Sequence, residues 1–160
     1  KALQILNEAI VIDSTYTTFY SDRLKCYIVL GDTLKAFEDA ETLISMDSLS
    51  TTGYVMRGYL YRITNNNKKA LDDLNHAVSL DTASSWAYNN RASYFMFIKE
   101  YKLAELDYKK VINQINEINK QKNSIARINN EYDKINGELI DVKGYSNILE
   151  ENIKIIETEN

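Results

Sequence analysis

Proline is absent from this chain of 160 residues, and only five glycines are present. Proline breaks helices and both residue types mark turns, so their scarcity favours long helical segments. A single cysteine, Cys26, excludes an intrachain disulfide and a multi-cysteine metal site. With one histidine, His76, and acidic residues that do not cluster, we expect no catalytic residues, no metal, no cofactor and no enzymatic activity.

Long apolar runs are also missing. None approaches the length of a membrane-spanning helix and no signal peptide is visible, so we expect no membrane span. The chain begins at Lys1, already inside a helical pattern, and we interpret it as an excised fragment. The missing targeting signal therefore leaves the compartment unknown, with the cytoplasm slightly favoured. A formal net charge of −4 argues against a nucleic-acid partner.

What the chain does contain is a pattern that recurs at a constant interval. Small residues, which let two antiparallel helices approach closely, occupy one register, and aromatic residues occupy two others. The small residues are Ala2, Ala36, Ala70 and Ala104, with Gly58 and Ala92 at one fixed distance before two of them. The aromatic residues are Tyr20, Tyr54 and Tyr88, and then Tyr27, Tyr61 and Phe95. A fixed period of 34 residues indicates stacked helical units.

Turn signals follow the same period. Short polar pairs fall between units, where we expect them to end one helix and to accept hydrogen bonds from the first amides of the next. These pairs are Asp13-Ser14, Asp47-Ser48 and Asp81-Thr82. A second break falls inside each unit, at Gly31-Asp32, at Asn65-Asn66-Asn67 and, more weakly, at Lys99-Glu100. Each unit is therefore expected to be a pair of helices.

These features resemble the tetratricopeptide repeat (TPR), a helix–turn–helix unit with a period of about 34 residues. The resemblance covers residues 1–115, as a half repeat at 1–13 and full repeats at 14–47, 48–81 and 82–115. It implies an all-α fold, a right-handed superhelix of antiparallel helix pairs. The proline that usually ends each repeat and the leading tryptophan are missing, and the family tolerates both variations.

Opposite charges also recur in register. Arginines stand at Arg23, Arg57 and Arg91, and each is followed at the same interval by an aspartate, at Asp39, Asp73 and Asp107. In an antiparallel helix pair that turns near its middle, these positions face one another. We therefore predict one ion pair in each unit, and we interpret the pairs as structural, because an anion-binding site would not be needed in every unit.

Residues 116–160 depart from the repeat. No turn signal occurs near Ile115, so we expect the last helix of the array to continue into this extension. Residues that are apolar except for Ser146 step by three and four, as in a coiled coil, at Ile125, Ile128, Tyr132, Ile135, Leu139, Val142, Ser146, Leu149, Ile153 and Ile156. Two interpretations stay open: a helix that caps the array or fills its groove, and a homodimer through residues 125–156.

In TPR arrays the first helix of each repeat lines the concave face. Transferred to this chain, that face is aromatic and methionine-containing with amide donors beside it, which suits a peptide or a helix. The implied groove residues are Lys25, Val55, Met56, Tyr59, Arg62, Trp86, Asn89, Asn90, Met96 and Phe97. The alternative is that Met56, Trp86, Met96 and Phe97 pack against neighbouring units or under the extension.

One TPR subtype holds the carboxylate at the end of a chaperone with basic and asparagine side chains. The corresponding positions here hold an unsuitable set, which is Ser21, Lys25, Met56, Trp86 and Asn90. The resemblance therefore implies a non-catalytic scaffold or adaptor for another protein or peptide partner. The alternatives are a self-association module built on the extension and the sensor half of a truncated TPR regulator. Related pentatricopeptide arrays bind RNA, which the acidic charge disfavours.

Overall fold

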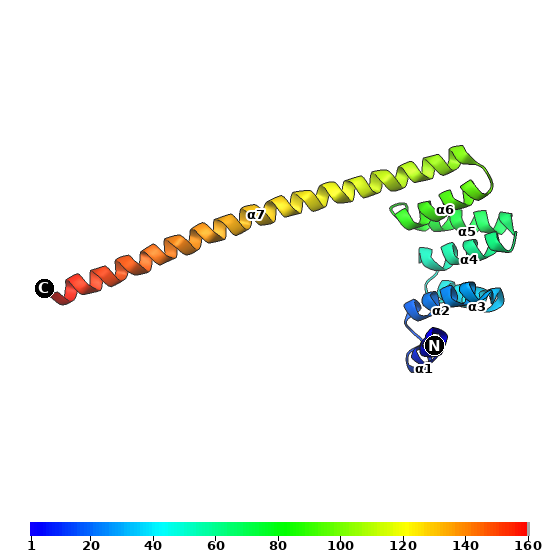
Figure 1. Cartoon of the computed structure of the whole chain (residues 1–160), viewed down its shortest axis with the longest axis horizontal. Coiled ribbons are helices and arrows are strands. Elements are labelled where there is room, and N and C mark those ends of the chain that lie inside the picture. Colours follow the sequence, from blue (N-terminus) through cyan, green and yellow to red (C-terminus); the bar gives the residue numbers. More distant parts are fainter. Residues whose placement is uncertain (160) are drawn as a thin grey trace. The chain divides into compact units, whose positions relative to one another are not determined.

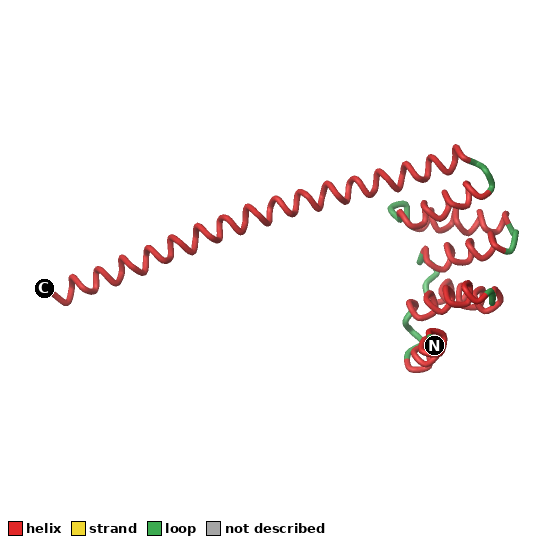
Figure 2. Tube along the Cα trace, viewed as in Figure 1, coloured by secondary structure: helices red, strands yellow, loops and turns green. Residues whose placement is uncertain are grey.

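The computed structural model describes the backbone of residues 1–159 and the side chains of residues 1–136. This part of the chain is helical throughout and contains no strand (Figures 1 and 2), which confirms the all-α prediction. The helices are α1 (Ala2–Ile12), α2 (Thr17–Leu30), α3 (Thr33–Met46), α4 (Thr51–Ile63), α5 (Asn67–Leu80), α6 (Ser85–Phe97) and α7 (Tyr101–Glu159).

The chain divides into two units, Lys1–Ile115 and Asn116–Asn160. In the first unit, α2 pairs with α3, α4 with α5, and α6 with the beginning of α7, in a stack of antiparallel helices (Figure 1). The second unit consists of the remainder of α7. That helix continues through Ile115, as expected. The side chains of the apolar series from Leu139 to Ile156 lie outside the described residues.

A left-handed residue ends the first helix of every pair. Gly31, Asn65 and Lys99 have φ angles of 75°, 61° and 64°, and they occupy equivalent positions in successive repeats. The next amide in each turn donates to a carbonyl five residues earlier, at 2.8 to 3.0 Å, as in Asn66 to Tyr61. This pattern satisfies carbonyls that the helix end would otherwise leave free. The breaks predicted within each unit are confirmed, including the weak one at Lys99.

Aspartates end the second helix of each unit, but their role differs from the expectation. Each carboxylate binds the amide two residues later, inside the turn, and not an amide of the next helix. The pairs are Asp13 with Thr15 at 2.8 Å, Asp47 with Leu49 at 3.0 Å, and Asp81 with Ala83 at 2.8 Å. Helices α4 and α6 are capped instead by Ser50 and Ser84. The side chain of a turn aspartate is too short to reach past its own turn.

Small residues bring the paired helices together as the repeat predicted. Ala36, Ala70 and Ala104 are fully buried, whereas Ala2 is exposed because no first helix of its own unit packs on it in the described chain. A side chain at Gly58 would approach Leu74 Cγ to 3.0 Å and the Ala70 carbonyl oxygen to 3.3 Å. The residue at that point of the crossing must therefore be small.

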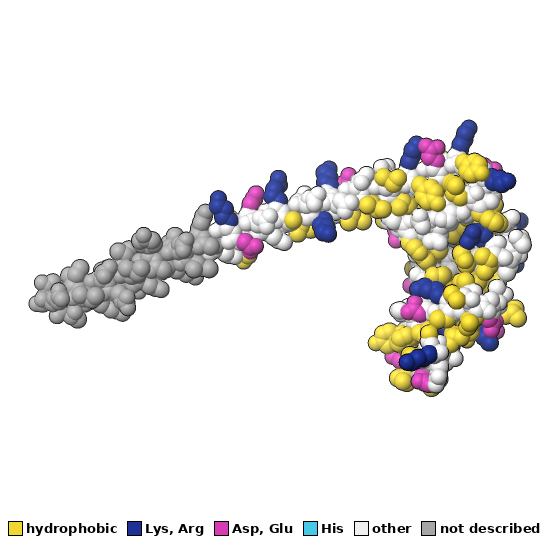
Figure 3. Space-filling model, viewed as in Figure 1, with side chains coloured by type: hydrophobic (Ala, Val, Ile, Leu, Met, Phe, Trp, Pro, Cys, Tyr) yellow, Lys and Arg dark blue, Asp and Glu magenta, His cyan; other side chains and the backbone are white. Residues whose placement is uncertain are grey.

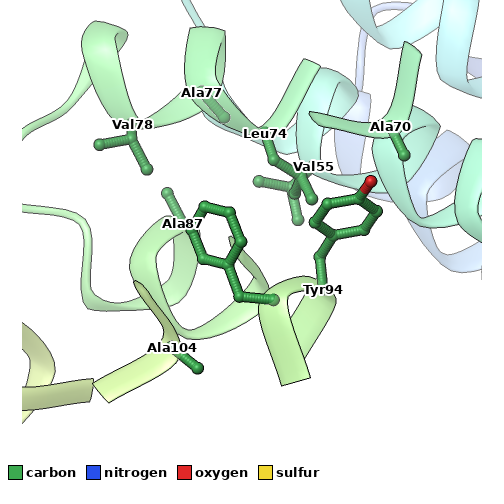
Figure 4. Close-up of a cluster of buried hydrophobic side chains, with 9 residues drawn as sticks. Val55, Ala70, Leu74, Ala77, Val78, Ala87, Tyr94 and Ala104 are labelled. Atoms are coloured by element: carbon green, nitrogen blue, oxygen red, sulfur yellow. The ribbon is translucent and has the colours of Figure 1, made fainter. Parts of the chain in front are cut away.

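Two clusters of buried apolar residues form the core of the first unit. One lies around Leu24, Leu43 and Leu60. The other combines Val55, Leu74, Ala77, Val78, Ala87, Tyr94, Phe95 and Ala104 with Ala70 (Figure 4). Residues of four helices, α4 to α7, meet in the second cluster, so packing fixes the position of α4 against α6. These two helices carry most of the residues expected in the groove.

Candidate functional site

Each arginine of the repeat makes the predicted ion pair. Arg57 Nε and Nη2 donate to the two carboxylate oxygens of Asp73, both at 2.8 Å. The same two-bond geometry joins Arg23 to Asp39 at 3.0 and 2.6 Å, and Arg91 to Asp107 at 2.8 and 2.8 Å. The three aspartates are between 2 and 8 % exposed. Parallel hydrogen bonds of this kind fix geometry as well as charge.

Sequence reasoning missed a third partner of these arginines. The Nη1 atom of each one donates to a residue 16 positions earlier, on the preceding unit, at 2.8 to 2.9 Å. The acceptors are Asn7, Glu41 and Asn75, which also recur with the period of the repeat and could have been found by that signal. Each arginine therefore joins the second helices of two consecutive units.

Aromatic rings enclose the same guanidinium groups. The Arg57 guanidinium lies 5.6 Å from the Tyr54 ring and 6.0 Å from the Tyr61 ring, and the other two arginines have matching neighbours. The hydrogen bonds from Arg57 to Asp73 and Glu41 raise the pKa of its guanidinium above its ordinary value, against the effect of burial. Arginines with this many partners hold the array together and are not free to bind a ligand.

A different arginine lies in a cavity. A cavity of about 150 Å³ opens between α4, α5 and α6. We call it the Arg62 pocket, and it is lined by Gly58, Tyr59, Arg62, Leu74, Asn90, Ser93 and Tyr94. Three residues expected in the groove, Tyr59, Arg62 and Asn90, therefore lie around one cavity. The neighbours Gly58, Leu74 and Tyr94 were not expected there.

Arg62 is framed by aromatic rings and makes no ion pair in the described part of the chain. Its guanidinium lies 4.8 Å from the centre of the Tyr59 ring and 5.6 Å from that of Phe97, on the next repeat. Among the described residues, no carboxylate lies within ion-pair distance of it. Asn90 is held in place by a hydrogen bond from its Nδ2 to the Trp86 carbonyl, at 2.8 Å. The pocket thus presents a positive charge beside an amide.

The other expected groove residues divide between surface and core. Trp86, Met96 and Phe97 are 39, 46 and 49 % exposed, and Asn89 is exposed as well. Met56 is half-buried against the Leu24 cluster. Val55 is only 1 % exposed and cannot touch a peptide, so its assignment to the groove was wrong. The register of the first helix turns Val55 inward because the buried face of α4 also includes Gly58, three residues on.

Lys25 lies apart from the Arg62 pocket. Its ammonium group pairs with Asp22 at 2.8 Å. It lines a larger, apolar cavity of about 400 Å³ between α1 and α2, which was not anticipated, together with Lys1, Ala2, Leu3, Cys26, Val29 and Leu30. Within the described residues, no group of acidic, histidine and cysteine side chains is arranged to hold a metal ion. No helix in that part of the chain is long and apolar enough to cross a membrane.

Solved structures with the same fold share little sequence with this chain. TTC0263, a thermophilic TPR protein of Thermus thermophilus, is 16 % identical, with a TM-score of 0.65, over 70 % of this chain and 63 % of its own. MamA is 20 % identical, with a TM-score of 0.55, over 70 % of this chain and 66 % of its own. This chain therefore spans slightly less than two thirds of either protein.

A third solved structure holds a peptide. It is the second TPR domain of Spaghetti (RPAP3) bound to the HSP90 peptide SRMEEVD, which is 21 % identical, with a TM-score of 0.53, over 61 % of this chain and 91 % of that domain. No curated protein sequence matches the chain significantly. The tetratricopeptide repeat family model matches residues 51–84, which span α4, α5 and the turn that follows. Together with the constant period and the stacked helix pairs, this match shows that residues 51–84 form a tetratricopeptide repeat within an array of the same helical fold.

Proposed function

We propose that the chain is a non-catalytic scaffold that binds an acidic peptide segment of a partner protein at the Arg62 pocket. The observation that carries the proposal is Arg62 itself, whose charge no described carboxylate neutralises. The repeat's other arginines, such as Arg57, are fully engaged within the fold. Arg62 is therefore the arginine of the array that is available to a ligand.

The surroundings of Arg62 suit a carboxylate. A guanidinium donates two parallel hydrogen bonds to a carboxylate, and the Tyr59 and Phe97 rings restrict its motion before a ligand arrives. A group that is already ordered loses less entropy on binding. Asn90 and Ser93 line the same cavity and can bond a peptide backbone. The exposed Trp86 and Met96 offer apolar contacts nearby on α6.

The Spaghetti domain supports this proposal, because it shows that an array of this fold can hold a peptide with several acidic residues. The mode proposed here differs from the chaperone-type arrangement. Met56 and Trp86 occupy two of the positions where that arrangement needs polar side chains. A third position, Ser21, is buried and donates to the Thr18 carbonyl at 2.9 Å. We therefore place the acidic contact at Arg62, outside that set.

We expect a non-catalytic role because the tetratricopeptide repeat is generally a protein-interaction fold. The adjacent carboxylates Asp72 and Asp73 are the nearest approach to an acid–base pair in the sequence. Asp73 is bound on both oxygens by Arg57. A carboxylate held in this way is a poor general base, because its lone pairs are already occupied.

The test is selection of binding peptides from a random display library on the immobilised chain, followed by affinity measurements by fluorescence anisotropy. We expect the selected peptides to share an acidic position, and Arg62→Glu to weaken their binding by about tenfold or more. Lys68→Glu is the matched control, because it makes the same charge change at an exposed site on α5. Selected peptides without acidic residues, or equal binding by Arg62→Glu, would contradict the proposal.

A further inference from the structure

The described part of α7 carries an apolar stripe that nothing in the described chain covers. Ile118, Ile125, Ile128, Tyr132 and Ile135 are each between 58 and 63 % exposed. They follow one another at intervals of seven, three, four and three residues, so they occupy one face of the helix. Apolar side chains are visible along this stretch in Figure 3. Large side chains arranged in this way are costly to leave in water.

The interval pattern is that of a coiled-coil seam. If Ile118, Ile125 and Tyr132 are placed at the a position of a heptad, Gln121, Ile128 and Ile135 take the d position. The same register continues in the sequence through Ile156, and both Gly137 and Gly144 fall at the outermost f position. A glycine there weakens the helix without interrupting the seam. The seam of the described residues runs from Ile118 to Ile135, and the same heptad pattern extends in the sequence to residue 156, beginning one heptad before the 125–156 stretch predicted above.

Charges beside the seam indicate what covers it. Glu117 takes the g position and Lys122 the following e position, and in a parallel in-register pair of helices these two positions meet across the interface. Both side chains are exposed, and neither makes an ion pair within the described part of the chain. The sequence repeats this g–e combination with Glu138 and Lys143, three heptads later. A second copy of the chain in that arrangement would bring a complementary charge to each of these places.

We propose that α7 pairs with α7 of a second copy as a parallel, in-register coiled coil along residues 118–156. This self-association is independent of peptide binding, because the seam contains none of the residues of the Arg62 pocket. It provides the assembly with two pockets, so a partner with two acidic segments binds with avidity. The polar Gln121 at a d position favours one register over shifted ones, because only the in-register arrangement pairs it with itself.

The first test is the mass of the full chain by sedimentation equilibrium over a range of concentrations. We expect a species of at least two copies, which Ile128→Lys combined with Ile135→Lys converts to monomer. Asn123→Lys combined with Asn130→Lys adds the same charge at f positions and is expected to leave the assembly intact. A chain that is monomeric at every concentration would overturn the proposal, and that outcome favours an extension that packs on its own array.

A second test determines orientation and does not depend on disrupting the helix. In a Cys26→Ser background, Gln121→Cys is expected to form an intermolecular disulfide under mild oxidation, because equivalent d positions of parallel in-register helices adjoin. Asn123→Cys, on the outer face, is the control and should remain reduced. An assembly in which Gln121→Cys crosslinks no better than Asn123→Cys is not parallel and in register, and the proposal is then wrong.

Discussion

Arg57 and Asp73 face each other across the α4–α5 pair, joined by two parallel hydrogen bonds of 2.8 Å. A third bond of 2.8 Å joins Arg57 to Glu41 on the preceding repeat. One side chain therefore connects the two helices of its own repeat and the repeat before it. The arrangement recurs with Arg23 and Arg91, so the same contacts that close each repeat also set the stacking of the array.

Asp73→Asn tests how much the Arg57–Asp73 ion pair contributes to the stability of the array. The substitution keeps the size of the side chain but removes the buried carboxylate that binds Arg57 twice, so that the exposed Glu41 is its remaining acidic partner. We expect the free energy of unfolding to fall by about 3 kcal/mol, as for other buried pairs that lose one member. Asp72→Asn, on the exposed neighbouring carboxylate, should change it by less than about 0.5 kcal/mol. Urea unfolding followed by circular dichroism measures both, and equal effects would contradict a structural role for the pair.

Lys99→Gly should stabilise the array. Lys99 has a φ of 64°, a conformation that costs a side-chain-bearing residue about 1 kcal/mol and glycine nothing. Gly31 already occupies the equivalent turn of the first full repeat, with a φ of 75°. Lys110→Gly, at an exposed site in the interior of α7, is the opposite case and should destabilise by about 1 kcal/mol. Thermal unfolding of the two variants should therefore shift in opposite directions, and a lower midpoint for Lys99→Gly would contradict the assignment of strain.

Gly53→Ala should destabilise the packing of α4 on α3. A Cβ at this position would lie 2.6 Å from Ile44 Cγ1 and 3.0 Å from the Ile44 backbone nitrogen. Alanine gains up to about 1 kcal/mol of helix propensity over glycine, but overpacking against backbone costs about 1 to 3 kcal/mol. We expect a net loss of roughly 1 kcal/mol, measured by urea unfolding. A variant more stable than the parent chain would show that α3 can move aside.

Asp32, at the start of α3, should make a small, pH-dependent contribution to the stability of the folded chain. Its carboxylate accepts hydrogen bonds from Lys35 Nζ at 2.8 Å and from the Lys35 amide at 3.2 Å, and these lower the pKa of Asp32 below 3.8. Because the folded-state pKa is the lower one, the stabilisation is complete above the unfolded pKa and is lost as pH falls through the folded one. Lys35→Met should raise the pKa of Asp32 in an NMR titration, though not to its ordinary value, since the amide bond remains. An unchanged pKa would exclude the Lys35 side chain as its main cause.

Regular positions were predictable from the sequence, and irregular ones were not. The Arg57–Asp73 pair was predicted because antiparallel helices of known period bring these two positions face to face. The Glu41 contact was missed although its position recurs with the repeat period, because pairing it with Arg57 also requires the rotation of one repeat against the next. Val55 was misplaced because the family's groove positions were transferred without the register of α4, which places Val55 on the buried face with Gly58. The sequence also could not predict that Arg62 lacks an ion-pair partner among the described residues, because this depends on which carboxylates the fold brings close to it.

The central claim is that Arg62 contacts an acidic side chain of a bound peptide. A double-mutant cycle measures this contact directly: the Kd of the best selected peptide is determined for the parent chain and for Arg62→Ala, each with the peptide's acidic residue intact and replaced by alanine. The account predicts that either change alone weakens binding, and that the second change adds little once the first is made. Effects that simply add would mean that the two side chains do not meet, and would contradict the account.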